Sequence, residues 1–362
     1  MTNLDIAHQR LHNQLISQRT CEKPGDVVEW LGAVQAQDYA AAKWAVGLRM
    51  QNATDDAIEQ ASASGALLRT HVMRPTWHFV TPADIRWMLA LTAPRVIAAS
   101  AYYYRALGLD DTVFSHSNTV LAKALQGGKQ LTRAELASVL QQAGIATDNL
   151  QRTGQIIMHA ELDGIICSGA RRGKQFTYAL LDERAPQTVT LDREEALAEL
   201  ARRYFSSHGP ATLQDFVWWS GLTVTDARAG LEMVTSQLVR EVIDSQTYWR
   251  SASTPPANDL SQIIYLLPNY DEYTVGYTDR RAIFDASGAE KLDTRGDVLN
   301  PTIVRDGLVV GTWKRTLKKD AVILSPSLFA SQNEAEMRAL AASARRYGAF
   351  LNMAVSVDVH LS

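Results

Sequence analysis

Two glutamines separated by one small residue, Gln35 and Gln37, form a distinctive polar pattern in this sequence. They follow an apolar stretch and precede an alanine-rich run, a setting in which amide side chains are uncommon. Residues i and i+2 diverge on a helix but share a face in an extended segment. Two interpretations stay open: solvated amides at a frayed helix end, or two amides that grip one small polar object, such as a water or a sugar oxygen.

Basic side chains gather in three places along the chain. Residues 66–105 hold five arginines against one acid, Asp84. The second cluster is Arg171, Arg172 and Lys174, and the third is Lys314, Arg315, Lys318 and Lys319. Such clusters are often solvated faces, but they are also what a nucleic-acid-binding surface looks like in a sequence.

The first basic cluster contains a predicted hairpin. We expect strands over 67–73 and 76–80 that turn at Arg74-Pro75, because proline has a fixed φ and suits a turn. Strand alternation then places Trp77 inside and His78 outside. His78 and the nearby His71 lack a third ligand, so they do not predict a metal site.

Composition excludes several classes of protein. The chain has 362 residues, of which 46% are hydrophobic and 21% charged, with a net charge of -3. These values are typical of globular proteins and exclude a disordered or collagen-like chain. The two cysteines, Cys21 and Cys167, form no C-x-x-C pair, which fits a reducing cytosol. We find no signal peptide, membrane-spanning run, or common nucleotide-binding, metalloprotease or serine-hydrolase motif.

The middle of the chain follows the element order of a winged helix. Three helices, the second opened by a capping box at Thr132, precede two strand-like runs around the basic tip at 169–174. The helices are predicted over 118–125, 133–142 and 147–163, and the strands over 165–167 and 176–180.

The same order recurs on both sides of this segment. Toward the C-terminus we predict three helices and a hairpin over 238–249, and toward the N-terminus helices that include one from Pro24 through Val34. A linker at 254–256 then leads to strand-rich sequence, in which Asp306-Gly307 is a strong hairpin-turn signal. Asn333 is predicted to cap a helix that runs to about Tyr347. The predicted fold is α+β, with winged helices at 1–110, 111–185 and 186–256 and a small C-terminal β or α+β domain at 257–362.

Several motifs together resemble those of the tandem winged-helix DNA glycosylases of the AlkZ/YcaQ type, and the resemblance covers nearly the whole chain. The hairpin fits the pattern R-x-H-x-M-R-x-T-W-H of that family, and Gln35 and Gln37 fit its Gln-x-Gln subgroup, in contrast to the Gln-x-Asp subgroup. The matching runs are 34–39 (VQAQDY), 44–49 (WAVGLR), 68–80 (LRTHVMRPTWHFV), 216–222 (FVWWSGL), 267–273 (LPNYDEY) and 311–315 (GTWKR).

The resemblance implies excision of alkylated bases from DNA, including N7-alkylpurines and some interstrand crosslinks, by three winged helices arranged as a C-shaped clamp. Gln35 and Gln37 would be catalytic, and Asp38 is a further candidate because it follows them directly. We expect damaged double-stranded DNA as the partner, no cofactor or metal, no membrane, a monomer, and a cytoplasmic, nucleoid-associated location. The expected DNA contacts are Arg69, His71, Arg74, His78, Arg152, Arg171, Arg172, Lys174, Asn269, Lys314 and Arg315.

Two other functions fit the predicted fold. A transcriptional regulator would bind one operator without releasing a base. A protein-interaction scaffold would bind its partner without the steep salt dependence of phosphate contacts. The glutamine pair together with the basic hairpin favours the enzyme.

Overall fold

The structure is a computed structural model that describes residues 2–186, 189–253, 263–284, 300–331, 333–358 and 360–361. Helices and sheets divide between two compact units. The first holds Met1–Glu59, Leu197–Trp219 and Thr223–Ser362, and the second holds Gln60–Ala196 and Ser220–Leu222. The linker predicted at 254–256 lies outside the described residues. Among the helices of the described ranges, none has the length and apolar character needed to cross a membrane.

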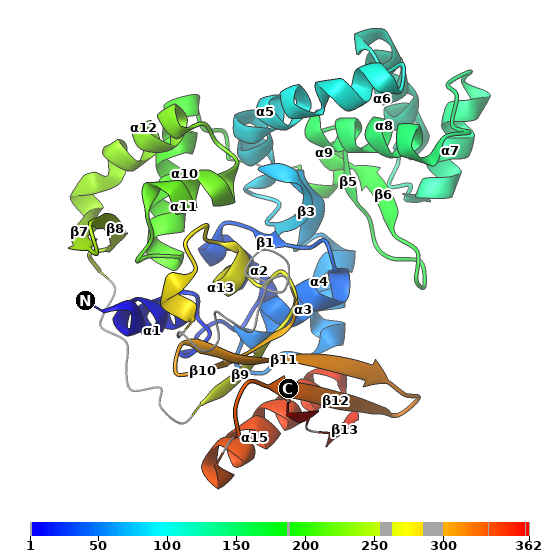
Figure 1. Cartoon of the computed structure of the whole chain (residues 1–362). Coiled ribbons are helices and arrows are strands. Elements are labelled where there is room, and N and C mark those ends of the chain that lie inside the picture. Colours follow the sequence, from blue (N-terminus) through cyan, green and yellow to red (C-terminus); the bar gives the residue numbers. More distant parts are fainter. Residues whose placement is uncertain are drawn as a thin grey trace. The chain divides into compact units, whose positions relative to one another are not determined.

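The first unit contains a six-stranded sheet, with helix α15 (Glu334–Leu351) beside it (Figure 1). Its order is β13-β12-β11-β10-β9, and β14 lies beside β12. Asp306 and Gly307 both have positive φ, 52° and 79°, at the turn from β10 to β11, which confirms the predicted hairpin. The strands are β9 (Ile264–Leu267), β10 (Thr302–Arg305), β11 (Leu308–Leu317), β12 (Ala321–Leu328), β13 (Ala354–Val357) and β14 (His360–Leu361).

Helix α15 packs against β9, β12 and β13 and begins at a capping box on Asn333, as the sequence predicted. The ring centre of Tyr347 in this helix lies 5.0 Å from the ring centre of Trp44 and 5.2 Å from that of Trp313. Trp44 belongs to α3 (Tyr39–Leu48). Each indole N–H also donates to a carbonyl of β9, so these aromatic side chains join α3, the sheet and α15 in one core.

The first unit also contains helices and strands outside this core. Strands β7 and β8 form the antiparallel hairpin predicted over 238–249. The elements that lie wholly or mostly in this unit are α1 (Asn3–Asn13), α2 (Pro24–Leu31), β1 (Val34–Gln35), α10 (Arg193–Ser207), α11 (Leu213–Ser220), α12 (Val224–Val234), β7 (Leu238–Ile243), β8 (Gln246–Ser251) and α13 (Glu272–Val275). Helix α4 (Asp55–Ser64) runs across the boundary of the two units in the sequence.

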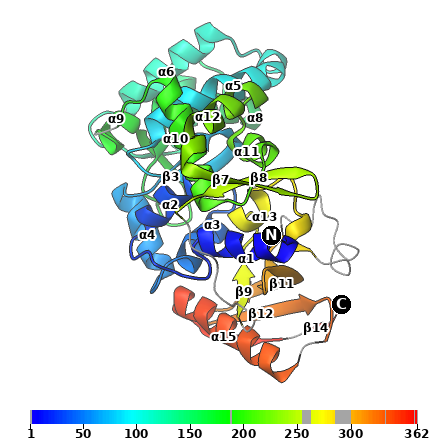
Figure 2. The same cartoon turned by 90° about the vertical axis from the view of Figure 1, so that its left-hand side faces the viewer.

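The second unit contains the element order predicted for residues 118–181. Helices α5, α6 and α8 pack together (Figure 2), and β4 and β5 both pair with β6. The capping box at Thr132 opens α7 as predicted, whereas α6 begins earlier than expected, at Asp111. The elements are α5 (Ile85–Ala106), α6 (Asp111–Leu125), β4 (Leu131–Thr132), α7 (Arg133–Gln142), α8 (Leu150–Leu162), β5 (Ile166–Ser168), β6 (Thr177–Leu180) and α9 (Leu181–Arg184).

The hairpin of the second unit differs from its prediction at the turn. Strands β2 (Leu68–Val72) and β3 (Arg74–Val80) turn at Met73, whose φ is 63°. Arg74 and Pro75 therefore belong to β3, not to the turn. The register also shifts between His71 and Val72, so a bulge lies just before the turn.

Helix α2 is shorter than predicted. It ends at Leu31 instead of continuing to Val34, because Gly32 has a φ of 81° and breaks the helical path. A Cβ atom at Gly32 would lie 3.2 Å from Cη2 of Trp219. The glycine therefore serves both a left-handed turn and a close approach, and it frees the following residues to be extended.

We predict that Gly32→Ala lowers the free energy of unfolding by ~1–2 kcal/mol, since it adds left-handed strain and a close contact with Trp219. Gly128→Ala is the matched control, because Gly128 also has positive φ but a Cβ there would meet no atom within 4 Å. Urea denaturation of both variants separates strain from crowding. Equal losses for the two variants would contradict the role of the Trp219 contact.

Candidate active site

The glutamine pair lies on an extended segment of the first unit, not on a helix end. Gln35 is the second residue of β1, and the chain then bends at Gln37 and Asp38, the latter being the N-cap residue of α3. Gln35 is only 9% exposed, whereas Gln37 is exposed. The interpretation as solvated amides at a frayed helix end is therefore wrong for Gln35, which lies buried on an extended segment.

Each carboxylate oxygen of Asp38 accepts a hydrogen bond from another residue of the first unit. Its Oδ1 accepts from the backbone N–H of Ala41, 3.0 Å away, and so caps the N-terminus of α3. Its Oδ2 accepts from Asn269 Nδ2 at 3.2 Å. The residue after the glutamine pair is thus fixed by the start of a helix and by the motif at 267–273.

Glu272, a residue that the sequence analysis missed, binds the backbone of Gln35. Its Oε1 accepts from the backbone N–H of Gln35 at 3.0 Å. Its Oε2 accepts from Trp219 Nε1 at 2.9 Å and lies 3.4 Å from His208 Nε2. The Glu272 side chain is 1% exposed. Its place in the motif N-Y-D-E-Y was the available signal, but nothing local in the sequence indicates that it contacts residue 35.

The neighbour of Glu272 in the motif, Asp271, is anchored by a buried arginine. Asp271 and Arg49 are both fully buried and form two hydrogen bonds of 2.8 Å. Arg49 also donates to Ala45 and to both oxygens of Gln14. Asp271 caps α13 through the backbone N–H of Tyr273, 2.9 Å away. Asp271 therefore has a structural role, as the partner of Arg49 and the cap of α13.

A pocket of about 710 Å³ is lined by Asp38, the residue that follows Gln37 in the sequence. Three of the predicted DNA contacts also line this pocket. Polar and charged side chains line part of it and buried aromatic rings line another part. Arg315 Nη1 donates to the hydroxyl of Tyr347, which holds this cation at the pocket wall. The residues concerned are Asp38, Asn269, Lys314, Arg315, Trp44, Trp313 and Tyr347.

In the second unit, Arg69 and Arg171 meet on one aromatic ring. Their guanidinium carbons lie 4.6 Å and 5.2 Å from the ring centre of Phe176. Arg69 also lies 4.2 Å from the ring centre of Trp77 and is only 7% exposed. The planar guanidinium of Arg69 therefore packs between rings, a use that leaves little of it accessible to a phosphate.

Both histidines of the hairpin are buried, and the burial of His78 contradicts our expectation that it faces outward. His78 is fully buried and its Nδ1 lies 3.0 Å from the carbonyl of Thr76, whereas Trp77 is half-buried. His71 lies 2.6 Å from Glu161 and is 6% exposed. Alternation fails because α5 and α8 pack against this hairpin and a bulge interrupts its pleat.

The remaining predicted DNA-contacting cations of the second unit differ in their exposure and in their partners. Arg152 is half-buried and donates to the carbonyls of Leu107 and Ala146. Arg172 is exposed and pairs with Glu135 at 2.8 Å, which helps to lower the pKa of that carboxyl to about 2, after the larger effect of the Thr132 backbone. Lys174 is exposed and Arg74 is half-buried.

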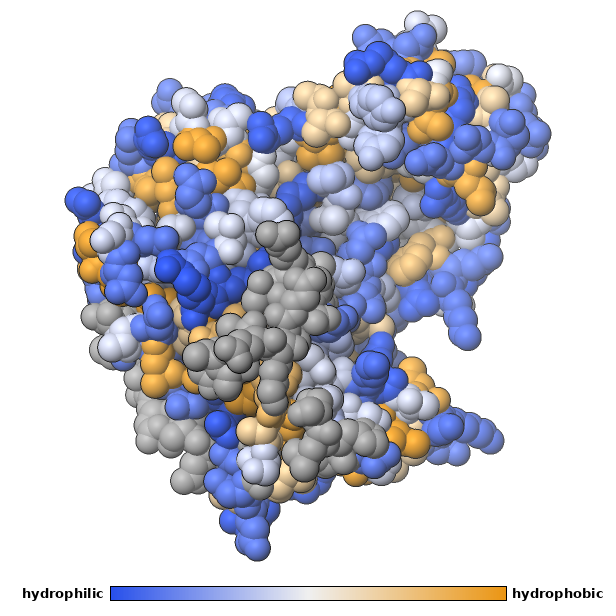
Figure 3. Space-filling view, viewed as in Figure 1, coloured by the Kyte–Doolittle hydropathy of each residue, from blue (hydrophilic) through white to orange (hydrophobic). Residues whose placement is uncertain are grey.

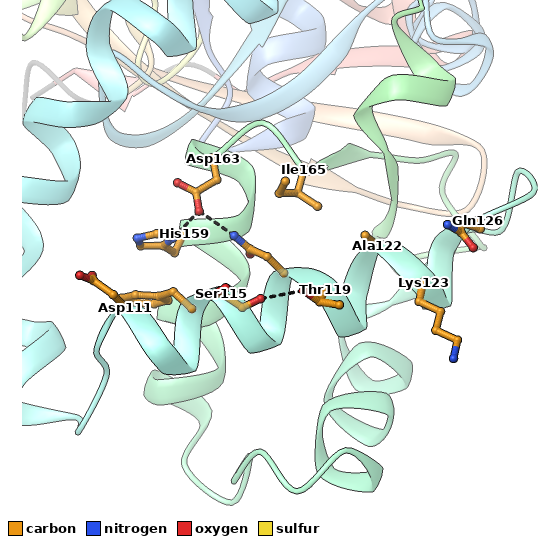
Figure 4. Close-up of a pocket in the computed structure, with 11 residues that line it drawn as sticks. Asp111, Ser115, Thr119, Ala122, Lys123, Gln126, His159, Asp163 and Ile165 are labelled. Carbon is orange, nitrogen blue, oxygen red and sulfur yellow. Dashed lines mark hydrogen bonds and ion pairs between the residues drawn. The ribbon is translucent and has the colours of Figure 1, made fainter.

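A separate pocket of about 860 Å³ in the second unit contains none of the predicted site residues (Figure 4). His159 stacks on Phe114 with 3.6 Å between ring centres and lies 3.0 Å from Asp163. Asn118 donates to the same Asp163 at 2.6 Å. These contacts hold α6 against α8 and give the polar groups a structural use. No group of three or more His, Cys, Asp and Glu side chains in the described ranges could hold a metal ion.

Comparison with known proteins identifies the class. The family model of AlkZ-like DNA glycosylases matches residues 28–350, and the chain therefore belongs to this family. It is a DNA glycosylase, a hydrolase that acts on N-glycosyl bonds in DNA repair. This confirms the enzyme prediction over the regulator and scaffold alternatives.

The particular proteins that the chain resembles come from Streptomyces sahachiroi. An interstrand DNA cross-link repair glycosylase is 26% identical over 319 residues, which cover 84% of this chain and 85% of that protein. The solved structure of the DNA glycosylase AlkZ superposes with a TM-score of 0.80 at 21% identity. The superposition covers 99% of this chain and 100% of the other, so the two proteins share a fold.

We predict that Arg49→Met costs ~3–5 kcal/mol of stability, because it leaves the buried carboxylate of Asp271 without its cation. Arg338→Met, which removes an exposed pair with Glu334, is expected to cost less than ~1 kcal/mol. Thermal and urea unfolding measure both changes. A loss for Arg49→Met no larger than that of the control would show that the Arg49 pair is not an anchor.

Proposed function

We propose that this chain hydrolyses the N-glycosidic bond of purines alkylated at N7 in duplex DNA, and that Gln35 and Gln37 act at the reacting sugar. The observation that carries the proposal is the placement of this pair. Gln35 is buried on an extended strand with its backbone bound to Glu272, and Gln37 is exposed beside the capped start of α3. A buried side-chain amide on a held backbone, together with an accessible side-chain amide, is suited to bind a water and the sugar.

Two neutral amides are chemically sufficient for this leaving group. Glycosidic hydrolysis passes through a transition state that resembles an oxocarbenium ion. An N7-alkylpurine already carries positive charge on the base, so it leaves without the protonation that ordinary glycosides need. The enzyme then has to orient a water and stabilise the sugar cation, which the carbonyl oxygens of Gln35 and Gln37 can do. Undamaged bases leave far less readily, and normal DNA is thereby spared.

The DNA partner is proposed to bind through exposed cations at two hairpin tips. The tip between β5 and β6 carries Arg172 and Lys174, and the tip between β11 and β12 carries Lys318 and Lys319. Both tips are hydrophilic in the space-filling view (Figure 3). Such side chains can meet phosphates without base-specific readout, which suits an enzyme that must find damage in any sequence.

The finer architecture is also a proposal. Residues 111–180 follow the order helix, strand, helix, helix, strand, strand, with β4 and β5 on either side of β6. This is the order of a winged helix, and we propose that the chain uses three such units in tandem as a monomer on duplex DNA. We extend the substrate class to interstrand crosslinks, because the Streptomyces sahachiroi relative is named for their repair.

We predict that Gln35→Ala and Gln37→Ala each slow the release of 7-methylguanine from a duplex by ~10²- to 10³-fold, by analogy with the loss of one preorganised polar group. Alkali cleavage of the abasic product measures release, with magnesium chelated. Gln51→Ala is the control, because Gln51 is an exposed glutamine of the same unit outside the site. Unchanged release by both site variants would overturn the proposed role of the pair.

We predict that Lys318→Ala weakens binding to undamaged duplex of any sequence and reduces the salt slope of binding by about one. Arg338→Ala, a 72% exposed cation on α15 outside both hairpin tips, is expected to leave that slope unchanged. Fluorescence anisotropy titrations at several salt concentrations measure the slope. An equal effect of the two substitutions would show that the β11–β12 tip has no specific contact with DNA.

A further inference from the structure

We infer that Glu272 is a positioning residue for Gln35, an inference that rests on the proposed function of the glutamine pair. Glu272 does not act on the DNA itself, because its carboxylate is buried. It holds the backbone N–H of Gln35 at 3.0 Å and so fixes where the amide side chain begins.

The acceptor is itself held by donors on its second oxygen. Trp219 Nε1 donates to Oε2 at 2.9 Å, and His208 Nε2 lies 3.4 Å from the same atom. Because Trp219 and His208 both contact Oε2, the carboxylate cannot rotate freely, and the direction in which Oε1 points is fixed. A carboxylate is suited to this position, since it only accepts and every neighbouring group named here can donate.

Burial lowers the pKa of His208 and favours its neutral ring, which carries one ring N–H. The ring stacks on Tyr204 with 4.8 Å between centres and 14° between planes. Its Nδ1 lies 2.8 Å from Ser207 Oγ. The ring of His208 is therefore contacted at both nitrogens, by Ser207 and by Glu272. The side chains of His208 and Glu272 are therefore held in fixed orientations.

The main chain at Glu272 is equally fixed. Tyr270 has a φ of 59°, which turns the chain into α13, and Asp271 is bound to Arg49. Glu272 follows directly as the first residue of α13. Because Glu272 is held at both its backbone and its carboxylate, a change in its position also displaces the backbone of Gln35. A displacement of about 1 Å of a catalytic group can cost 10²-fold in rate.

Glu272→Gln tests the inference, because the amide keeps the shape of the side chain but replaces one acceptor oxygen with a donor. We expect the single-turnover release of 7-methylguanine to fall ~10- to 100-fold while the Kd for the duplex changes by less than about twofold. Backbone amide exchange of residues 33–37, followed by mass spectrometry, is expected to accelerate.

The matched control is Asp215→Asn. Asp215 is also a fully buried carboxylate of the first unit, and it accepts from the backbone N–H groups of Thr212, Thr278 and Asp279. We expect its variant to lose a similar amount of thermal stability but to keep the wild-type rate and the wild-type exchange at 33–37. If Glu272→Gln does not fold, Trp219→Phe removes one donor to Oε2 and is expected to slow release several-fold.

The outcomes separate this inference from the proposed function. Wild-type release by Glu272→Gln, or an equal slowing by Glu272→Gln and Asp215→Asn, overturns the positioning role. If the wild-type protein itself releases no base, the proposed substrate is wrong, and the exchange measurement decides alone. Faster exchange at 33–37 in Glu272→Gln but not in Asp215→Asn then supports the contact, and unchanged exchange overturns it.

Discussion

The buried pair of Arg49 and Asp271 is the interaction on which the geometry of the site depends. Removing two charges from water is costly, and the cost is offset only when every donor and acceptor is used. Arg49 meets this condition, since all of its N–H groups donate to Gln14, Ala45 or Asp271. The pair ties α1, α3 and α13 together. It therefore fixes the motif at 267–273 relative to the segment that carries the glutamines.

Three polar residues of that motif then have separate partners. Asn269 binds Asp38, Asp271 binds Arg49, and Glu272 binds the backbone of Gln35. The arrangement keeps the carboxylate of Glu272 behind the backbone, while the exposed amide of Gln37 remains on the accessible side. An uncharged amide at the sugar suits the proposed reaction with a cationic leaving group, because no strong acid has to protonate the base.

Features with local causes could be predicted from the sequence, and features with distant causes could not. The capping boxes at Thr132 and Asn333 and the turn at Asp306-Gly307 are correct, because the interactions lie within four residues. The end of α2 was placed too late, although Gly32 is a local signal, since an apolar run masked it. Glu272 was missed because its partner is 237 residues away in the chain.

The histidine error has a different physical origin and bears on how the DNA contacts divide. Alternation predicts facing only when one side of a hairpin is solvated, and α5, α8 and β5 pack against this one. Arg69 is consequently used in stacking on Trp77 and Phe176. An arginine suits that role because its planar cation keeps its charge while its faces pack, whereas a lysine is a hydrated point charge on a flexible stem. The exposed lysines at the hairpin tips are therefore the groups from which we expect the salt-dependent part of DNA binding.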